Sequence, residues 1–197
     1  MGVKRIEKPS AAERPECESD ILLISRVSGG DRPAFEALYR RYRVRLERFL
    51  ANLVRHPQLA EEVLDDTLLV VWERAAGFKG ESKLSTWIFA IAYRKAMKAL
   101  RRYDAPVEDH DAENRASPDD GPEQAFGQTR LRDLLREAMT ELSPEHRGVI
   151  ELTYFNDLSY REIAEIMGCP VDTVKTRMFY ARRHLKRRLE GELPDWI

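Results

Sequence analysis

The residues best suited to chemistry lie near the end of the chain, in the stretch MGCPVDTVKTRMFYARRHLKRRL from Met167 to Leu189. From Asp172 onward this stretch has seven cations and one acid, although the whole chain is nearly neutral, with 33 Lys and Arg against 34 Asp and Glu. Basic side chains bind phosphate oxygens, whereas small polar and aromatic side chains can contact the edges of bases. This composition indicates a surface that binds nucleic acid.

Helical periodicity divides the same stretch into two faces. Five apolar residues recur at three- and four-residue steps and are expected to pack inward: Val171, Val174, Met178, Ala181 and Leu185. A second set then points outward, with Arg177, Tyr180 and Arg182 at its flanks: Lys175, Thr176, Phe179, Arg183 and Lys186. A major groove admits one helix and places phosphates on both sides of it. We therefore predict that this helix binds duplex DNA; the alternative is a solvated basic helix with no ligand.

The residues before this helix predict a helix-turn-helix. Ser159 and Glu162 have the spacing of a capping box, which opens a short helix. Gly168 stands where that helix needs a left-handed residue to end, and Cys169-Pro170 then turns the chain into the basic helix. Two short helices around a tight turn with glycine, the second of them basic, form the frame of this motif.

Charge is segregated along the chain. Residues 85–102 include several cations and no acid, whereas residues 104–123 have eight acids and a single cation, Arg115. The acidic segment also has three prolines and little to bury, so it is predicted to be a linker. The neutral total therefore conceals a basic N-terminal lobe, an acidic linker and a basic C-terminal lobe.

Two amphipathic helices are predicted in the stretches 32–57 and 58–77, the second ending at Gly77. On the second helix, four acids and a leucine share the outer face at i, i+3, i+4, i+7 and i+11. This acidic stripe consists of Glu62, Asp65, Asp66, Leu69 and Glu73. Such a stripe is either a solvated helix face or a docking face for a basic partner helix.

The loop GFKGESK leads to a third predicted helix, which begins near Ser85 as its N-cap. Arg94 and Lys98 share one side of this helix, and Phe78 and Trp87 are candidates for exposed aromatic residues beside it. Aromatic rings can stack on unpaired bases, at about 1–3 kcal/mol per base, while cations follow the phosphates. The pattern favours single-stranded nucleic acid; the alternative is that both aromatic residues belong to the core.

Other classes of protein are disfavoured. No apolar run approaches the roughly 20 residues of a membrane helix, and the first twenty residues do not form a secretory signal. The four histidines are scattered, and Cys17 and Cys169 are too far apart in sequence to suggest a metal site or a disulfide framework. GFKGESK lacks the spacing of a phosphate-binding loop. We therefore expect a cytoplasmic protein that is not an enzyme, with no cofactor and no metal, in which Cys169 is a packing residue.

Three stretches together resemble the extracytoplasmic-function sigma factors of bacterial RNA polymerase: AEEVLDDTLLVVWERA, FKGESKLSTWIFAIA and LSYREIAEIMGCPVDTVKTRMFYARRHL. The resemblance implies an all-α fold of two small helical domains joined by a flexible acidic linker, the second domain a helix-turn-helix. The implied parts are an N-terminal extension (1–19), a region 2-like domain (20–102), the linker (103–128), a region 4-like domain (129–190) and a C-terminal tail (191–197).

The resemblance also implies a role for each surface. The acidic stripe would dock on the largest polymerase subunit. The melted minus-ten element would be held by Phe78, Lys79, Gly80, Glu81, Ser82, Lys83, Trp87, Arg94 and Lys98. The duplex minus-thirty-five element would be bound by Tyr160, Arg161, Lys175, Thr176, Arg177, Phe179, Tyr180, Arg182, Arg183 and Lys186. The implied partners are core RNA polymerase, promoter DNA and an anti-sigma factor.

Some positions depart from the family pattern. The third helix has AIAYR where RIARN is usual, so Ala90 and Arg94 replace an arginine and an asparagine. Asp172 stands where glycine is frequent. The leading hypothesis is a promoter-specificity subunit, and the alternative is a helix-turn-helix regulator that acts without docking on polymerase.

Overall fold

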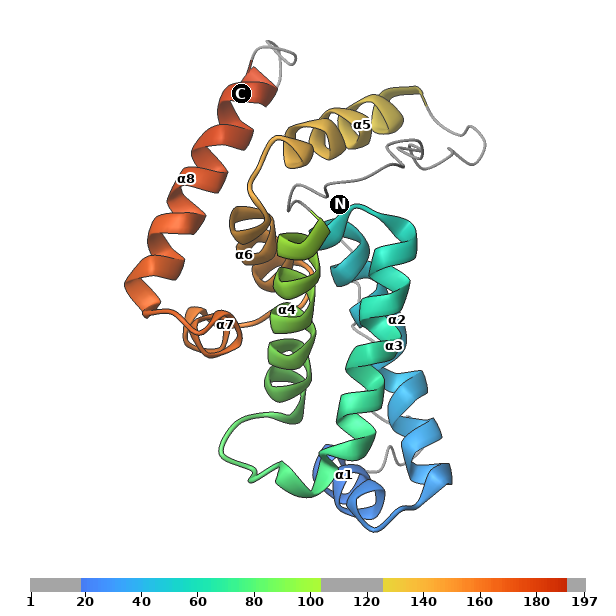
Figure 1. Cartoon of the computed structure of the whole chain (residues 1–197). Coiled ribbons are helices and arrows are strands. Elements are labelled where there is room, and N and C mark those ends of the chain that lie inside the picture. The colour runs from blue at the N-terminus through green and yellow to red at the C-terminus, as the bar shows by residue number, and fades with distance from the viewer. Residues whose placement is uncertain (1–18, 104–125, 191–197) are drawn as a thin grey trace, which may run out of the picture.

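The computed structural model describes residues 19–103 and 126–190, and in these ranges every regular element is a helix. The N-terminal lobe contains α1 (Asp20–Ser28), α2 (Arg32–Val54), α3 (Pro57–Glu73), the short 3₁₀ helix η1 (Ala75–Gly77) and α4 (Leu84–Tyr103). The C-terminal lobe contains α5 (Phe126–Thr140), α6 (Pro144–Tyr154), α7 (Tyr160–Met167) and α8 (Val171–Glu190). Figure 1 shows α4 at the centre, with α2 and α3 on one side and α7 on the other. The all-α prediction is confirmed.

Local signals in the helix-turn-helix segment act as predicted. The Ser159 hydroxyl accepts a hydrogen bond from the backbone N–H of Glu162, and the Glu162 carboxylate accepts one from the backbone N–H of Ser159. This reciprocal pair is the predicted capping box at the start of α7. Gly168 has φ of 63° and ends the helix in the left-handed region. The limits of α7 and the turn between α7 and α8 are thus fixed by residues that were identified in the sequence.

Two boundaries and one helix differ from the predictions. The third predicted helix begins at Leu84 rather than after a Ser85 cap, because the Lys83 carbonyl accepts the first helical hydrogen bond, from Trp87 N–H, and Leu84 is buried. The second ends at Glu73, before Gly77, because the chain tightens into η1. Helix α1 was not predicted at all.

Tertiary contacts explain why α1 is ordered. Its N-terminal Asp20 accepts hydrogen bonds of 2.6 Å from both the Tyr42 hydroxyl and the Arg41 guanidinium of α2. Leu23, Ile24 and Val27 are buried beneath it. None of these contacts is local in sequence, so a short nine-residue helix is stabilised by packing rather than by its own periodicity.

The predicted linker is bounded by helices that reach into its ends, since α4 extends to Tyr103 and α5 begins at Phe126. Residues 104–125, like the predicted N-terminal extension to residue 18 and the tail from residue 191, lie outside the described residues. None of the helices described combines the length and the apolar character needed to cross a lipid bilayer.

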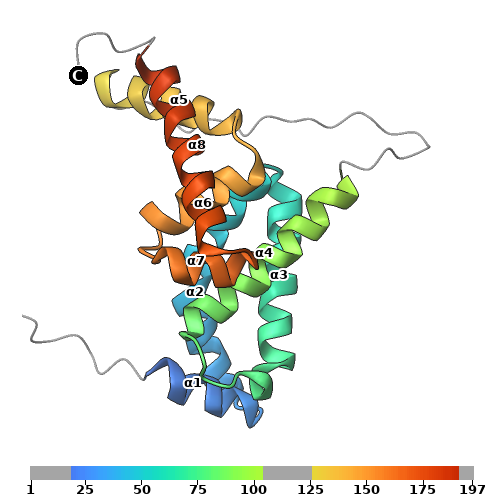
Figure 2. The same ribbon diagram turned by 90° about the vertical axis from the view of Figure 1, so that its left-hand side faces the viewer.

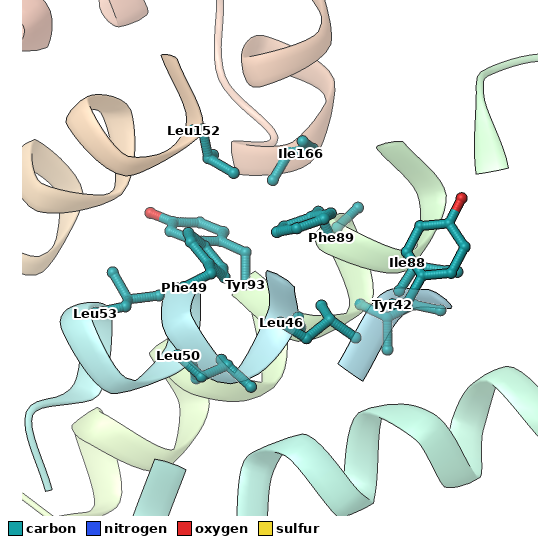
Figure 3. Close-up of a cluster of buried hydrophobic side chains, with 14 of the residues drawn as sticks. Tyr42, Leu46, Phe49, Leu50, Leu53, Ile88, Phe89, Tyr93, Leu152 and Ile166 are labelled. Atoms are coloured by element: carbon teal, nitrogen blue, oxygen red, sulfur yellow. The ribbon is translucent and has the colours of Figure 1, made fainter. Parts of the chain in front are cut away.

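The two lobes share one hydrophobic core. Helix α6 packs on α2, and α7 packs on α4, as both views of the ribbon show (Figures 1 and 2). In Figure 3, Leu152 from α6 and Ile166 from α7 lie against Phe49, Phe89 and Tyr93 of the N-terminal lobe, and all five side chains are buried. The lobes are therefore joined through apolar side chains as well as through the chain between them.

Candidate nucleic-acid interface

Helix α8 presents the predicted cationic face to solvent. Its apolar residues Val174, Met178 and Ala181 are buried, whereas the side of Lys175, Thr176, Arg182, Arg183 and Lys186 is exposed. Phe179 and Tyr180 are more than half exposed, at 60% and 54%, and their rings meet edge to face at 5.5 Å. Exposure of large aromatic side chains to solvent is unfavourable in a free protein. Beside cations, such side chains suit contact with bases.

The residues assigned to duplex DNA come together in space. Tyr160, at the start of α7, lines one shallow hollow of about 540 Å³ with the cations of α8: Lys175, Arg182, Arg183 and Lys186. Phe179 forms part of the same hollow, and Arg161 beside Tyr160 is exposed. The structure thus brings the residues of α7 and α8 that were predicted to bind duplex DNA to one surface, as a helix-turn-helix requires.

Two cations at the start of α8 have partners within the protein. Lys175 Nζ lies 2.9 Å from the Asp172 carboxylate, three residues before it, and both side chains are exposed. Arg177 is half-buried, with Nη1 3.7 Å from the Cys169 thiol. Asp172 therefore offsets the charge of a lysine on the face predicted to bind DNA.

The far end of α8 has a different role. Arg188 forms ion pairs with Glu141 at 2.7 Å and Glu137 at 3.5 Å, and His184 Nε2 lies 3.0 Å from the Glu141 carboxylate. These contacts tie α8 to the end of α5. His184 and Arg188 therefore hold the C-terminal half of α8 against α5, whereas Arg182, Arg183 and Lys186 of the same half are exposed.

The loop before α4 differs in one respect from the prediction. Phe78 and Trp87 are half-buried and pack against the core, with ring centroids 5.5 Å apart, rather than standing exposed. Gly80 between them has φ of 73°, which explains glycine at the tip of the loop. Lys79 and Glu81 are exposed and Ser82 is half-buried.

Helix α4 is covered on two opposite sides. The six consecutive residues Ile88, Phe89, Ala90, Ile91, Ala92 and Tyr93 are all buried. A helix buried all round has neighbours on both faces, which here are α2 with α3 on one side and α7 on the other. Arg94 and Lys98 remain exposed on a third side.

The acidic stripe lies on the outer surface of α3. Glu62, Asp65, Asp66 and Glu73 are exposed, and Leu69 between them is 53% exposed. Asp66 forms an ion pair of 2.7 Å with Lys95 of α4. The remaining carboxylates leave a negative surface around an apolar side chain, which suits a basic, partly apolar partner.

A polar network between the lobes was missed by sequence reasoning. The buried Arg147 of α6 donates to the carbonyls of Leu53, Leu142 and Thr140, at 3.0, 2.7 and 3.4 Å. Burial and the nearby Arg55 lower the pKa of Arg147 to about 10. One guanidinium thus satisfies orphan carbonyls at the ends of α2 and α5. In sequence Arg147 looks like a solvated helix residue, so no local signal could have found it.

Glu151, one turn later on α6, is also buried between the lobes. Its Oε1 accepts a 3.0 Å hydrogen bond from Asn52 Nδ2 of α2. Burial raises the pKa of Glu151 above its usual value of 4.5, and the Asn52 hydrogen bond and the Arg48 charge oppose this only in part. The ionised carboxylate is therefore destabilising where it stands.

We expect Glu151→Gln to stabilise the protein by about 1 kcal/mol at pH 7.5, because the neutral amide keeps the Asn52 hydrogen bond without the buried charge. A raised folded-state pKa means that the wild type loses stability as pH rises above 4.5, so the gain should vanish near pH 4.5. Urea unfolding at both pH values measures this. The exposed Glu165→Gln on α7 is the control, and an equal gain at both pH values would contradict the assignment.

Within residues 19–103 and 126–190 no three His, Cys, Asp or Glu side chains are grouped as a metal site would need. Cys169 is half-buried and packs against the core beside Arg177.

Comparison with protein families matches both lobes. Residues 38–105 match the model described as Sigma-70 region 2, and residues 132–185 match the model described as Sigma-70, region 4. The first match covers the acidic stripe, the aromatic loop and α4, and the second covers the helix-turn-helix. The order of the two regions is the order predicted from the sequence.

Whole proteins and solved structures agree with these matches. The chain is 30% identical over 188 residues to the RNA polymerase sigma-H factor of Pseudomonas aeruginosa, covering 90% of this chain and 97% of that one. It is also 30% identical over 182 residues to the ECF RNA polymerase sigma-E factor of Haemophilus influenzae, covering 87% and 96%. The sigma factor RpoE of Bartonella quintana, solved with the anti-sigma factor NepR, has 28% identity and a TM-score of 0.65 over 79% of this chain and 98% of that one. The chain therefore belongs to the extracytoplasmic-function sigma factors of bacterial RNA polymerase.

Proposed function

We propose that the protein is a promoter-specificity subunit, which binds core RNA polymerase, recognises two promoter elements and thereby initiates transcription at selected sites. The observation that supports this most is that one chain has both an exposed cationic, aromatic face on α8 and an exposed acidic stripe on α3. The first suits DNA and the second suits a basic protein surface. The role consists of binding and positioning, and the polymerisation chemistry belongs to the polymerase.

We assign the duplex minus-thirty-five element to α8. The first half of the helix would enter the major groove, where Thr176 and the exposed ring of Phe179 can reach base edges. Arg182, Arg183 and Lys186, further along, would bind phosphates. Tyr160 and Arg161 would contact the backbone from the preceding helix. The hollow shared by Tyr160 and these cations supports this arrangement.

We assign the melted minus-ten element to the loop at residues 78–83 and the exposed side of α4. The Phe78 and Trp87 rings, packed together at 5.5 Å, form a prepared edge on which an unpaired base can stack. Extruding a base costs a few kcal/mol, which such stacking offsets. Lys79, Arg94 and Lys98 are exposed nearby and can follow the phosphates.

We propose that core polymerase binds the acidic stripe. We also propose that an anti-sigma factor is a partner of this protein. The relation to RpoE, which was solved with its anti-sigma factor, supports the second assignment. On this view the parts of the chain have the limits expected from the sequence, with residues 20–102 serving the polymerase and the minus-ten element and residues 129–190 serving the minus-thirty-five element.

The alternative is a DNA-binding regulator that acts without the polymerase, and run-off transcription separates the two. Purified protein and core polymerase should give defined transcripts from members of a promoter pool, with none from core polymerase alone. DNA binding without transcripts, together with no complex between the protein and core polymerase at sub-micromolar concentration, would favour the regulator.

Arg182→Ala should weaken promoter binding and lower the salt slope of the logarithm of the binding constant by about one, since one phosphate contact is lost. Lys175→Ala should have a smaller effect, because Lys175 must first leave Asp172. Asp172→Ala should strengthen binding for the same reason. Fluorescence anisotropy across a salt titration measures all three. Unchanged affinity and slope in Arg182→Ala would show that α8 is placed wrongly.

A further inference from the structure

A large cleft is bordered by α2 and α3 on one side and by α5, α6 and α8 on the other. Its volume is about 1310 Å³, above the roughly 300–1,000 Å³ of small-molecule sites, so it has room for a peptide segment. We propose that the C-terminal tail of this chain, residues 191–197, docks in this cleft as an intramolecular ligand. Docked there, the tail covers the apolar side of α5 and must leave before another protein binds that surface.

The cleft leaves apolar side chains open to solvent. Leu135 and Met139 of α5 and Leu185 of α8 line it, and all three are half-buried. Tyr154 and Phe155, at the end of α6, also line it and are 56% and 47% exposed. Apolar side chains gathered in one hollow are unfavourable in water and mark a surface that binds another segment.

Contacts around α5 keep the cleft from closing on itself. Helix α5 lies beside α8 in both views, and the ion pair of Arg188 with Glu141 joins them at 2.7 Å (Figures 1 and 2). At the last residue of α5, the exposed Arg55 of α2 donates to the Thr140 carbonyl at 3.1 Å. These contacts fix α5 against α8 and against the end of α2, and its apolar side is left facing the cleft.

The charge of the cleft is opposite to that of the tail. Six arginines and four acids line the cleft, which is thus net positive in a chain whose formal net charge is −1. Arg55 and Arg182 are exposed on its walls. The tail, GELPDWI, has two acids, Glu192 and Asp195, and no cation. Complementary charge favours this pairing over that of the cleft with a basic segment.

Of the segments outside the described residues, the tail has the composition that suits an apolar cleft. Leu193, Trp196 and Ile197 give it three large apolar side chains in a short stretch. Residues 104–125 are rich in acids and contain no Leu, Ile, Met, Phe or Trp, so they offer little apolar surface. Residues 1–18 precede α1, which lies at the opposite end of the molecule from α5 (Figure 1).

The tail is also long enough to reach the cleft. Leu185 lies five residues before Glu190, where α8 ends, or about 7.5 Å along the helix axis. Trp196 is six residues beyond Glu190, a reach of roughly 20 Å if extended. Gly191 is the residue type that reverses the chain after a helix, and Pro194 cannot continue one. So short a tether gives the tail a local concentration on the order of millimolar, so a dissociation constant below about 1 mM keeps it docked.

Methionine-methyl NMR of the full-length chain tests the docking without any added ligand. Met139 lines the cleft, so the ring of a docked Trp196 lies near its methyl group and shifts the methyl resonance. Trp196→Leu removes the ring but keeps an apolar side chain, and it should move the Met139 resonance. The resonance of Met178, buried in α8, should stay in place. A Met139 resonance that is the same in the wild type and in Trp196→Leu would overturn the proposal.

A double-mutant comparison shows whether the tail docks in the cleft itself. Leu135→Asp places a charge on the apolar wall and should release the tail, so adding Trp196→Leu should no longer move the Met139 resonance. Val44→Asp is the matched control, because Val44 is 70% exposed on α2 and lies outside the lining of the cleft. In that background Trp196→Leu should move the resonance as in the wild type. Circular dichroism confirms that each variant keeps its helices. An equal movement in both backgrounds would show that the tail docks elsewhere.

Dilution separates the tail of the same chain from that of a second copy. Intramolecular docking predicts that the Met139 resonance stays unchanged over an about tenfold dilution of the protein. A resonance that moves on dilution toward its position in Trp196→Leu would mean that the tail of a second copy occupies the cleft, and would overturn intramolecular docking. Because these measurements involve neither polymerase nor DNA, the docking and the proposed function stand or fall separately.

Discussion

Arg147→Ala is expected to destabilise the protein by about 4 kcal/mol, because it removes a buried charged donor from three carbonyls and leaves a cavity. Arg147 donates to Leu53 O at the end of α2, to Leu142 O, and to Thr140 O at the end of α5. Helix ends whose carbonyls are buried without donors are strongly unfavourable. For a chain of this length, such a loss lowers the melting temperature by roughly 8–16 °C.

Two further variants separate the causes of this loss. Arg147→Met keeps much of the apolar volume but no donor, and it should retain most of the destabilisation. Arg55→Ala removes an exposed guanidinium that also donates to Thr140 O, at 3.1 Å, and should cost less than about 1 kcal/mol. Thermal and urea unfolding measure both. A loss below about 1 kcal/mol in Arg147→Ala would mean that water replaces the guanidinium at these carbonyls.

Arg147 also shows where reading the sequence reaches its limit. The capping box of Ser159 and Glu162, the left-handed Gly168 and the inward face of α8 are local patterns, and each was predicted and is present. The contacts of Arg147 with Leu53 and of Asn52 with Glu151 join residues about a hundred positions apart. No periodicity or cap specifies such pairs, so the contact between the lobes could not be predicted from the sequence.

The candidate sites divide in the same way. Cationic and acidic faces follow from helical spacing, and the exposed sides of α8 and α3 lie where the spacing places them. Exposure of Phe78 and Trp87 does not follow from spacing, because their half-burial depends on how the loop folds against the core. Lys83 belongs to the predicted minus-ten surface, but it forms an ion pair with Glu162 of the other lobe. The contacts of each residue with distant parts of the chain thus depend on the fold and could not be predicted from spacing.

Asp66→Arg is expected to weaken binding to core polymerase at least about 100-fold, or about 2.7 kcal/mol, while circular dichroism stays unchanged. Asp66 lies at the centre of the acidic stripe beside Asp65 and the exposed Leu69, and reversing its charge places like charges opposite a basic partner.

Because the substitution also breaks the ion pair of Asp66 with Lys95, the control is Lys95→Ala, which breaks the same pair but keeps the acid. Lys95→Ala should bind polymerase at least as tightly as the wild type, since an exposed pair of this kind adds little stability and its loss frees the carboxylate. Fluorescence-detected titration of labelled protein with core polymerase compares the three proteins. If Asp66→Arg assembles with polymerase as the wild type does, the stripe on α3 is solvated surface and the docking face lies elsewhere.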